Sequence, residues 1–210
     1  MPSGVHLFRK EELKTSLWSG GGMTELYIYP PGSSFAARDF QLSLVSATID
    51  TEESAFSDFS GYTRLIMSLD NNLELVHDHG TRVSLKQYEP HVFDGRIKTV
   101  SRGRVRDFNL IIRTGQGWGE SRVIRLAPGA SLYPQKIVGP RSQIFEFAYA
   151  PYNGYIFMAA EELEVRAGDF LVLDHSRMSF DYRFSNQGTE SCALIVGLAA
   201  LNQLNHYSGN

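Results

Sequence analysis

Short runs of apolar or alternating residues recur along the whole chain, and residues typical of turns separate them. Pairs such as Pro128-Gly129 and Asn153-Gly154 mark these turns. Strand-length runs at this spacing are typical of antiparallel sandwiches and barrels. The sequence therefore predicts an all-β protein, with strands over residues 25–29, 40–49, 63–69, 73–76, 82–85, 108–113, 122–126, 142–150, 155–158, 170–173 and 192–198.

Only two stretches are expected to be helical. Residues 10–17 carry Glu11 and Glu12 near their start, where acidic side chains suit the positive end of a helix dipole. A second, shorter helix is expected over residues 199–204.

The 210 residues can form one large domain or two small ones. No linker rich in proline, serine or charge divides the chain, and the best candidate boundary is the glycine-spaced stretch 114–120. We expect two β halves, residues 1–115 and 116–210, packed as one unit, with strands exchanged between them as an open alternative.

Charge and composition exclude several classes of partner. The net charge is −3 and no basic block stands out, so a nucleic-acid partner is not expected. We interpret Arg102, Arg104 and Arg106 as a solvated strand face. No window of about 18 apolar residues exists, which predicts no membrane span and no signal peptide. Cys192 is the only cysteine and lies in an apolar run, which indicates a buried thiol and a cytoplasmic location.

Three consecutive glycines, Gly20 to Gly22, follow Trp18. Glycine is unfavourable in helices and strands, so the triplet indicates a backbone that takes a positive φ or passes close to another group. That group is either a ligand or another strand. The triplet lacks the lysine and the following helix of a phosphate-binding loop.

His77 and His79 form a His-x-His pair that would point to one face of a strand and could share a metal. No carboxylate occurs in the next residues, and Asp78-His79-Gly80 has the composition of a turn. We therefore expect an exposed turn and no metal. His91 and His175 could complete a ligand set only if the tertiary fold brought them close to this pair, and their spacing in the sequence does not indicate that.

Two further segments carry side chains with specific chemistry. Arg64 opens an apolar run after an alternation of hydroxyl and aromatic residues. It is interpreted either as a bidentate hydrogen-bond donor to a ligand carboxylate or as an arginine that stabilises its own loop through backbone carbonyls. Asp107 and Asn109 share one strand face, opposite Phe108. Both are disfavoured in strands, so we expect them to hydrogen-bond to something specific.

Taken together, these residues resemble the HutD/Ves family. The resemblance rests on the stretch from Trp18 to Leu26, on Phe56-Ser57-x-Phe59 with Arg64, on Phe93 with Gly95, and on Gly103-x-x-x-Asp107-Phe108-Asn109, and it covers about residues 8 to 175. It implies a bicupin, in which two antiparallel cupin-type β-barrels (double-stranded β-helices) pack together in one chain. It also implies a regulatory or protective role in histidine utilisation or stress, with a small acid such as urocanate or formylglutamate as ligand.

The sequence departs from the family pattern at four positions. Ser19 stands where asparagine is usual, Phe40-Gln41 where Trp-Arg is usual, and Arg96 where aspartate is usual. We expect these changes of charge to alter the ligand preference, because an unpaired buried charge is costly.

The resulting prediction is a non-catalytic protein that binds an organic acid or amino-acid derivative. Trp18 would form an apolar wall, Thr24 and Asn109 would hydrogen-bond to the ligand, Arg64 would hold its anionic group, and Asp107 would orient Arg64 or accept from an amine. No cofactor, metal or catalytic residue is expected, and a homodimer is a possible assembly.

Two other functions stay open. A metal-free cupin isomerase or epimerase would need a tuned acid–base pair, for which His91 and Tyr62 are candidates. An interaction scaffold would instead use exposed aromatics such as Tyr149, Tyr152 and Tyr155, although hairpin packing also accounts for these.

Overall fold

The computed structural model describes residues 1–134 and 143–202, and this part of the chain is built almost entirely from strands. Two 3₁₀ turns, η1 (Lys10–Glu12) and η2 (Asp78–Gly80), interrupt them. The strands are β1 (Val5–Phe8), β2 (Lys14–Trp18), β3 (Gly21–Tyr29), β4 (Leu42–Ile49), β5 (Glu53–Ala55), β6 (Tyr62–Ser68), β7 (Leu73–His77), β8 (Arg82–Leu85), β9 (Pro90–Asp94), β10 (Thr99–Arg102), β11 (Val105–Arg113), β12 (Gly117–Leu126), β13 (Ser131–Leu132), β14 (Gln143–Tyr149), β15 (Tyr155–Met158), β16 (Glu162–Val165), β17 (Phe170–Asp174), β18 (Arg183–Ser185) and β19 (Cys192–Leu201). The predicted all-β class is confirmed.

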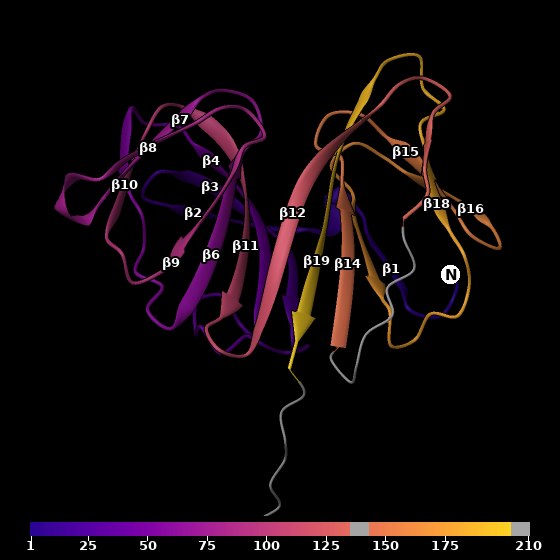
Figure 1. The fold of residues 1–210 in the computed structure, drawn as a ribbon, viewed down its shortest axis with the longest axis horizontal. Coiled ribbons are helices and arrows are strands. Elements are labelled where there is room, and N and C mark those ends of the chain that lie inside the picture. Colours follow the sequence, from indigo (N-terminus) through magenta and orange to yellow (C-terminus); the bar gives the residue numbers. More distant parts are fainter. Residues whose placement is uncertain (135–142, 203–210) are drawn as a thin grey trace, which may run out of the picture.

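The strands form four antiparallel sheets, two on each side of the molecule (Figure 1). Residues 14–113, here called the first half, form a six-stranded sheet (β2-β3-β4-β11-β6-β9) and a four-stranded sheet (β5-β10-β7-β8). Residues 117–201, the second half, form a four-stranded sheet (β13-β18-β15-β16) and most of a five-stranded one (β1-β17-β14-β19-β12). Strand β1 is the exception, because it comes from the N-terminus yet pairs with β17.

Alternation of side chains on β11 explains how the halves are held together. Phe108, Leu110 and Ile112 point to one face and join a core cluster that also contains Phe147 and Val172 from the five-stranded sheet. The rings of Phe108 and Phe147 lie 5.6 Å apart. The six-stranded sheet therefore buries one face against the second half, and its other face is directed into the first half.

The structure corrects both helix predictions. Within residues 10–17, only Lys10–Glu12 forms a 3₁₀ turn, and Lys14–Trp18 is a strand paired with β3. Ala199–Leu201 belongs to β19, where it pairs with β12 and β14, and residues 203–204 lie outside the described residues. Pairing with the adjacent strand β3 in the first case, and with the distant strands β12 and β14 in the second, outweighed local helix propensity.

Each predicted strand is present, with small differences at its ends. The sequence reading missed the short strands β1, β5, β9, β10, β13, β16 and β18. Cys192 is fully buried, as expected. Within residues 1–134 and 143–202, no helix has the length and apolar character needed to cross a bilayer.

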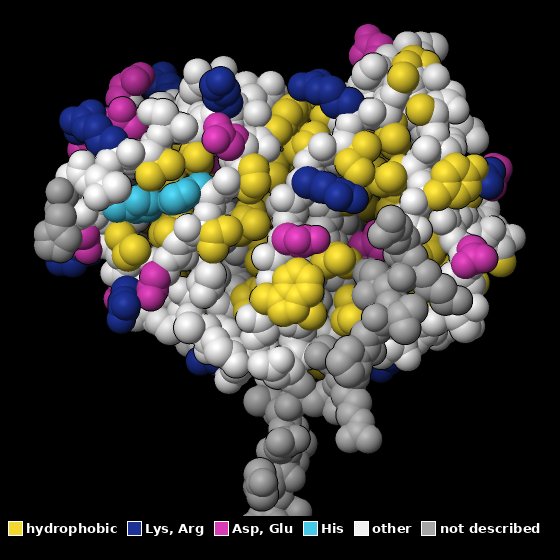
Figure 2. Space-filling view, in the orientation of Figure 1, with side chains coloured by type: hydrophobic (Ala, Val, Ile, Leu, Met, Phe, Trp, Pro, Cys, Tyr) yellow, Lys and Arg dark blue, Asp and Glu magenta, His cyan; other side chains and the backbone are white. Residues whose placement is uncertain are grey.

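The three arginines do not share one strand face. Arg102 ends β10 and pairs with Glu53, Arg104 lies in the turn that follows and pairs with Glu52, and Arg106 lies half-buried on β11. Basic and acidic side chains are scattered over the face of the molecule shown in Figure 2 and do not gather into one patch there.

Candidate functional site

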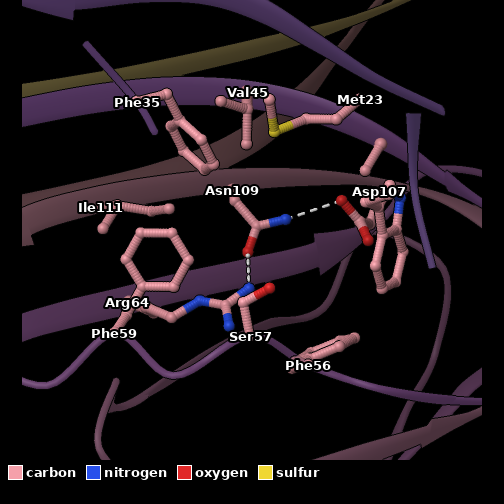
Figure 3. A pocket seen from close by; sticks show the side chains of 12 residues that line it. Met23, Phe35, Val45, Phe56, Ser57, Phe59, Arg64, Asp107, Asn109 and Ile111 are labelled. Carbon is pink, nitrogen blue, oxygen red and sulfur yellow. Dashed lines mark hydrogen bonds between the residues drawn. The ribbon is translucent and has the colours of Figure 1, made fainter. Parts of the chain in front are cut away.

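A cavity of about 80 Å³ lies inside the first half, on the inward face of the six-stranded sheet. Strands β2, β3, β4, β6 and β11 supply part of its lining, and the loops at residues 35 and 56–59 supply the rest (Figure 3). Its lining consists of Trp18, Met23, Phe35, Val45, Ala47, Phe56, Ser57, Phe59, Arg64, Asp107, Asn109 and Ile111. The surface is mainly apolar, with a few polar groups in one place, as is usual for small-molecule pockets.

The glycine triplet allows Trp18 to reach the cavity. A Cβ on Gly20 would lie 2.3 Å from the Trp18 ring, and one on Gly21 would lie 2.4 Å from the carbonyl oxygen of Thr48. Glycine is therefore required where the indole folds over the backbone and where β3 begins beside β4. The backbone thus approaches the Trp18 indole at Gly20 and the neighbouring strand β4 at Gly21.

Arg64 is the charged centre of the cavity. Residues Tyr62, Arg64 and Ile66 alternate onto the inward face of β6, which places the Arg64 side chain between the two sheets of the first half. Only 7% of Arg64 is exposed. Its guanidinium carbon lies 4.8 Å from the ring centroid of Phe56, 5.4 Å from that of Phe59 and 5.2 Å from that of Phe93. These rings hold the cation in place by cation–π contact.

A short hydrogen-bond chain connects Arg64 to Asp107 (Figure 3). Arg64 Nη2 donates to Asn109 Oδ1 over 2.8 Å, and Asn109 Nδ2 donates to Asp107 Oδ1 over 2.6 Å. Burial lowers the pKa of Arg64 to about 10, and the neighbouring Asp107 opposes that shift. Burial also raises the pKa of Asp107 to about 7, against the opposing effect of Arg64.

Two buried donors of lining residues have no hydrogen-bond acceptor among the residues that the structure describes. They are Nε1 of Trp18 and Nε of Arg64. Buried donors are nearly always paired in folded proteins, because an unpaired one loses its hydrogen bond to water. Both donors belong to side chains that line the cavity.

The structure brings together four of the five predicted ligand-binding residues: Trp18, Arg64, Asp107 and Asn109. Thr24 is not among them. It lies on the opposite face of β3, where its hydroxyl is 2.9 Å from that of Thr15. Met23 points into the cavity instead, because neighbouring strand residues face opposite ways.

Apart from Trp18, the apolar members of the lining had no predicted ligand role. Phe56 and Phe59 could have been identified as lining residues, because they belong to the Phe56-Ser57-x-Phe59 motif of the family. Phe35 comes from a loop distant in sequence, and no pattern in the chain indicated it.

The two histidines that meet are His77 and His91. Their Nε2 atoms are 3.0 Å apart, and His77 Nδ1 is hydrogen-bonded to Thr99 Oγ1. The side chain of His79 lies outside the described residues. Among the side chains that the structure describes, no group of three or more His, Cys, Asp or Glu is arranged to hold a metal ion.

Neither proposed acid–base candidate faces the cavity. His91 pairs with His77, and Tyr62 donates to the backbone oxygens of Arg38 and Phe40. The lining contains one carboxyl group, that of Asp107.

The aromatics considered for an interaction face do not form one. Tyr149 and Tyr155 are buried in core clusters, and Tyr152 remains 46% exposed. This agrees with the hairpin-packing interpretation.

The four departures from the family pattern lie outside the lining. Arg96 is exposed and pairs with Asp94, and Ser19 is exposed. Phe40 packs against Tyr62, and Gln41 is buried beside it without facing the cavity. They therefore add no charge to the lining itself, and their effect on ligand preference stays a prediction.

Comparison with solved structures shows the fold. The conserved protein of unknown function PA5104 from Pseudomonas aeruginosa PAO1 is similar with a TM-score of 0.76 at 19% identity, over 95% of this chain and 99% of that one. HutD from Pseudomonas fluorescens SBW25 is similar with a TM-score of 0.64 at 22% identity, over 92% and 97%. An oxalate decarboxylase matches with a TM-score of 0.64 at 8% identity, over 94% and 77%. At these identities the likeness establishes a cupin-type fold.

Sequence comparison gives the family. A search of the curated proteins finds no relative of significant similarity. The HutD family model matches residues 10–190, which is most of the chain. The resemblance seen in the motifs is thereby confirmed, and the chain belongs to the HutD family.

Proposed function

We propose that this protein binds a small carboxylic acid in the cavity of the first half, with Arg64 holding the carboxylate. One observation carries the proposal: Arg64 is almost fully buried, yet no carboxylate of a described residue lies within ion-pair distance of it. A buried charge is costly unless a counter-charge pairs with it. A bound anion would supply that charge.

The other polar groups fit the same ligand. Trp18 Nε1 and Arg64 Nε are free to donate to carboxylate oxygens. Asn109 holds the guanidinium in position from one side, and Phe56 holds it from the other. The small volume and the aromatic walls favour a compact acid, or the acid end of a longer one.

We extend the proposal to the architecture and the biological role. The two halves, divided near residue 115, would be the two cupin-type barrels of a bicupin. The protein would act in the cytoplasm as a non-catalytic regulatory or protective binder in histidine utilisation or stress, as a monomer or homodimer. The family resemblance implies urocanate and formylglutamate as the first acids to test, and the solved HutD from Pseudomonas fluorescens is described in a formate condition.

Calorimetry with urocanate, N-formylglutamate and formate tests the assignment. Arg64→Met should weaken binding of the preferred acid by about tenfold or more, since a charge-assisted hydrogen bond contributes about 1.5–3 kcal/mol. Arg96→Gln is the matched control, because Arg96 is exposed and paired with Asp94. Unchanged affinity in Arg64→Met, or no binding of any of the three acids, would contradict the proposal.

Asp107 favours a second candidate function. A carboxyl group with a pKa of about 7 beside a cation is suited to remove a proton from a bound acid, as an isomerase requires. Wild-type protein in D₂O would then exchange the α-hydrogen of its ligand, and Asp107→Asn would still bind but not exchange. Absence of exchange in the wild type would leave binding as the function.

A further inference from the structure

A second cavity, of about 220 Å³, lies between the two halves. It is on the opposite face of the same strands that line the first cavity. Met23, Val45 and Ala47 face the first cavity, whereas Thr24, Ser46 and Thr48 face the second. Alternation along β3 and β4 thus directs these side chains to opposite faces of the sheet, and the small Ala47 also borders the second cavity.

A row of hydroxyl groups forms the floor of this second cavity. Thr15, Thr24 and Ser46 are directly opposite one another on the adjacent strands β2, β3 and β4, and Thr48 is next along β4. Ser46 Oγ donates to the backbone oxygen of Asp107 over 2.9 Å. The rest of the contact between the halves is mainly apolar, so a polar patch here needs a separate reason.

Two cations border the same space, Arg106 from the first half and Lys10 from the segment before β2. Among the residues that the structure describes, neither side chain makes an ion pair, and the lining of this cavity contains no carboxylate.

Three carboxylates are hydrogen-bonded to residues of the lining. Asp70 accepts from the backbone nitrogen of Arg106, and Asp50 accepts from the hydroxyl of Thr48. Asp169 pairs with Arg9 over 2.7 Å and accepts from the backbone nitrogen of Lys10. Within the described part of the chain, none of them forms an ion pair with the side chain of Arg106 or Lys10.

We propose that this second cavity is a binding site for a compact hydroxylated anion, of the class of polyol phosphates. Arg106 and Lys10 hold the anionic group, and the hydroxyls of Thr15 and Thr24 meet the hydroxyl groups of the ligand. Of these two hydroxyls, one donates to the other, and the second keeps its proton for an external acceptor. The Tyr149 hydroxyl remains protonated, because burial raises its pKa.

Titration with glycerol 3-phosphate, inorganic phosphate and glycerol tests this site by calorimetry and amide chemical shifts. Glycerol 3-phosphate should bind more tightly than phosphate, glycerol alone should not bind, and higher salt should weaken the binding. Arg106→Gln should reduce the affinity for glycerol 3-phosphate by about tenfold or more. Thr24→Val should reduce that affinity to the level of phosphate.

Two controls separate this site from the first cavity. Arg104→Gln removes an exposed arginine close in sequence and should leave binding unchanged. Arg64→Met should also leave binding of glycerol 3-phosphate unchanged, although it removes the charge of the first cavity. The inference is overturned if none of the probes binds, if Arg106→Gln binds glycerol 3-phosphate as the wild type does, or if Arg64→Met abolishes the binding.

Discussion

Arg64 donates its 2.8 Å hydrogen bond to the neutral amide oxygen of Asn109, and the amide of Asn109 in turn donates to Asp107. The amide thus separates the buried cation from the buried carboxyl group. Because Asn109 cannot take up a proton, the two charges influence each other only through space. This arrangement leaves the remaining donors of the guanidinium available for a ligand.

Replacement of Arg64 by methionine should separate stability from binding. A buried charge without a counter-ion opposes folding, so Arg64→Met should leave the free energy of unfolding unchanged or raise it by about 1–3 kcal/mol. Asp107 would then stay protonated, because it loses its nearby cation. Urea unfolding measures this, and a loss of more than about 2 kcal/mol would indicate a structural role for the charge.

Asp107 should make the protein less stable as the pH rises from about 4 to 7. Its pKa is raised from 3.8 to about 7 on folding, so within this window the folded state holds a proton that the unfolded state has released. The contribution of Asp107 to the free energy of unfolding is fully present below pH 3.8, the pKa in the unfolded state. It declines by about 1.4 kcal/mol per pH unit, and by up to about 4 kcal/mol in total, as the pH reaches the folded-state pKa of about 7. The difference in unfolding free energy between wild type and Asp107→Asn, measured across the window, should follow this decline. A difference that is flat with pH would contradict it.

The affinity for a carboxylic acid should decrease above about pH 7. Ionised Asp107 and the ligand carboxylate would then compete for the same cation, so binding favours the protonated form of Asp107. Calorimetry in two buffers of different ionisation enthalpy should show proton uptake on binding near pH 7. Asp107→Asn should bind with no such uptake, and uptake that persists in this variant would assign the proton to another group.

Gly20→Ala should displace Trp18 from the cavity wall. The added Cβ would lie 2.3 Å from the indole, and strain of this kind costs about 1–3 kcal/mol. Trp118 is 56% exposed, so the blue-shifted part of the tryptophan emission should come from Trp18 and should decrease in the variant. Gly22→Ala is the control, because its nearest neighbour would be 3.6 Å away. Equal effects of both substitutions would refute this account.

The His77–His91 pair should make the protein sensitive to acid. Burial lowers the pKa of both imidazoles, and His91 lowers that of His77 further. The unfolded state therefore binds more protons, so the stability that is present above the ordinary histidine pKa of 6.5 is lost as the pH falls through and below it. His91→Phe should flatten the stability profile below pH 6.5 in acid unfolding experiments, whereas the exposed His6→Gln should not. A steeper acid loss in His91→Phe would contradict this.

The strands could be predicted because their signal is local. Turn residues and alternation located the longer strands, from residues 25–29 to 192–198. Lys14–Trp18 was missed because its structure depends on pairing with Gly21–Tyr29, and β1 was missed because its partner β17 is distant in sequence. A pattern read along the chain cannot detect such partners.

The site was partly predictable for the same reason. Arg64, Asp107 and Asn109 are polar residues in apolar strands, which marks them in the sequence as unusual. That Thr24 lies on the face opposite to Arg64 could not be foreseen, because the six-stranded sheet has polar residues on both faces and only the packing of the second half decides which face is inward. The cation of the second cavity, Arg106, was interpreted as solvated because a single sequence does not show what covers a strand.

Strand β1 completes the edge of a sheet whose other members begin more than a hundred residues later. Without it, β17 would present a row of unpaired backbone groups, which invites association with other chains. A chain divided at the turn between β11 and β12 would leave Val5–Phe8 on the fragment whose sheets do not use it. The other fragment would then lack the edge strand that covers β17.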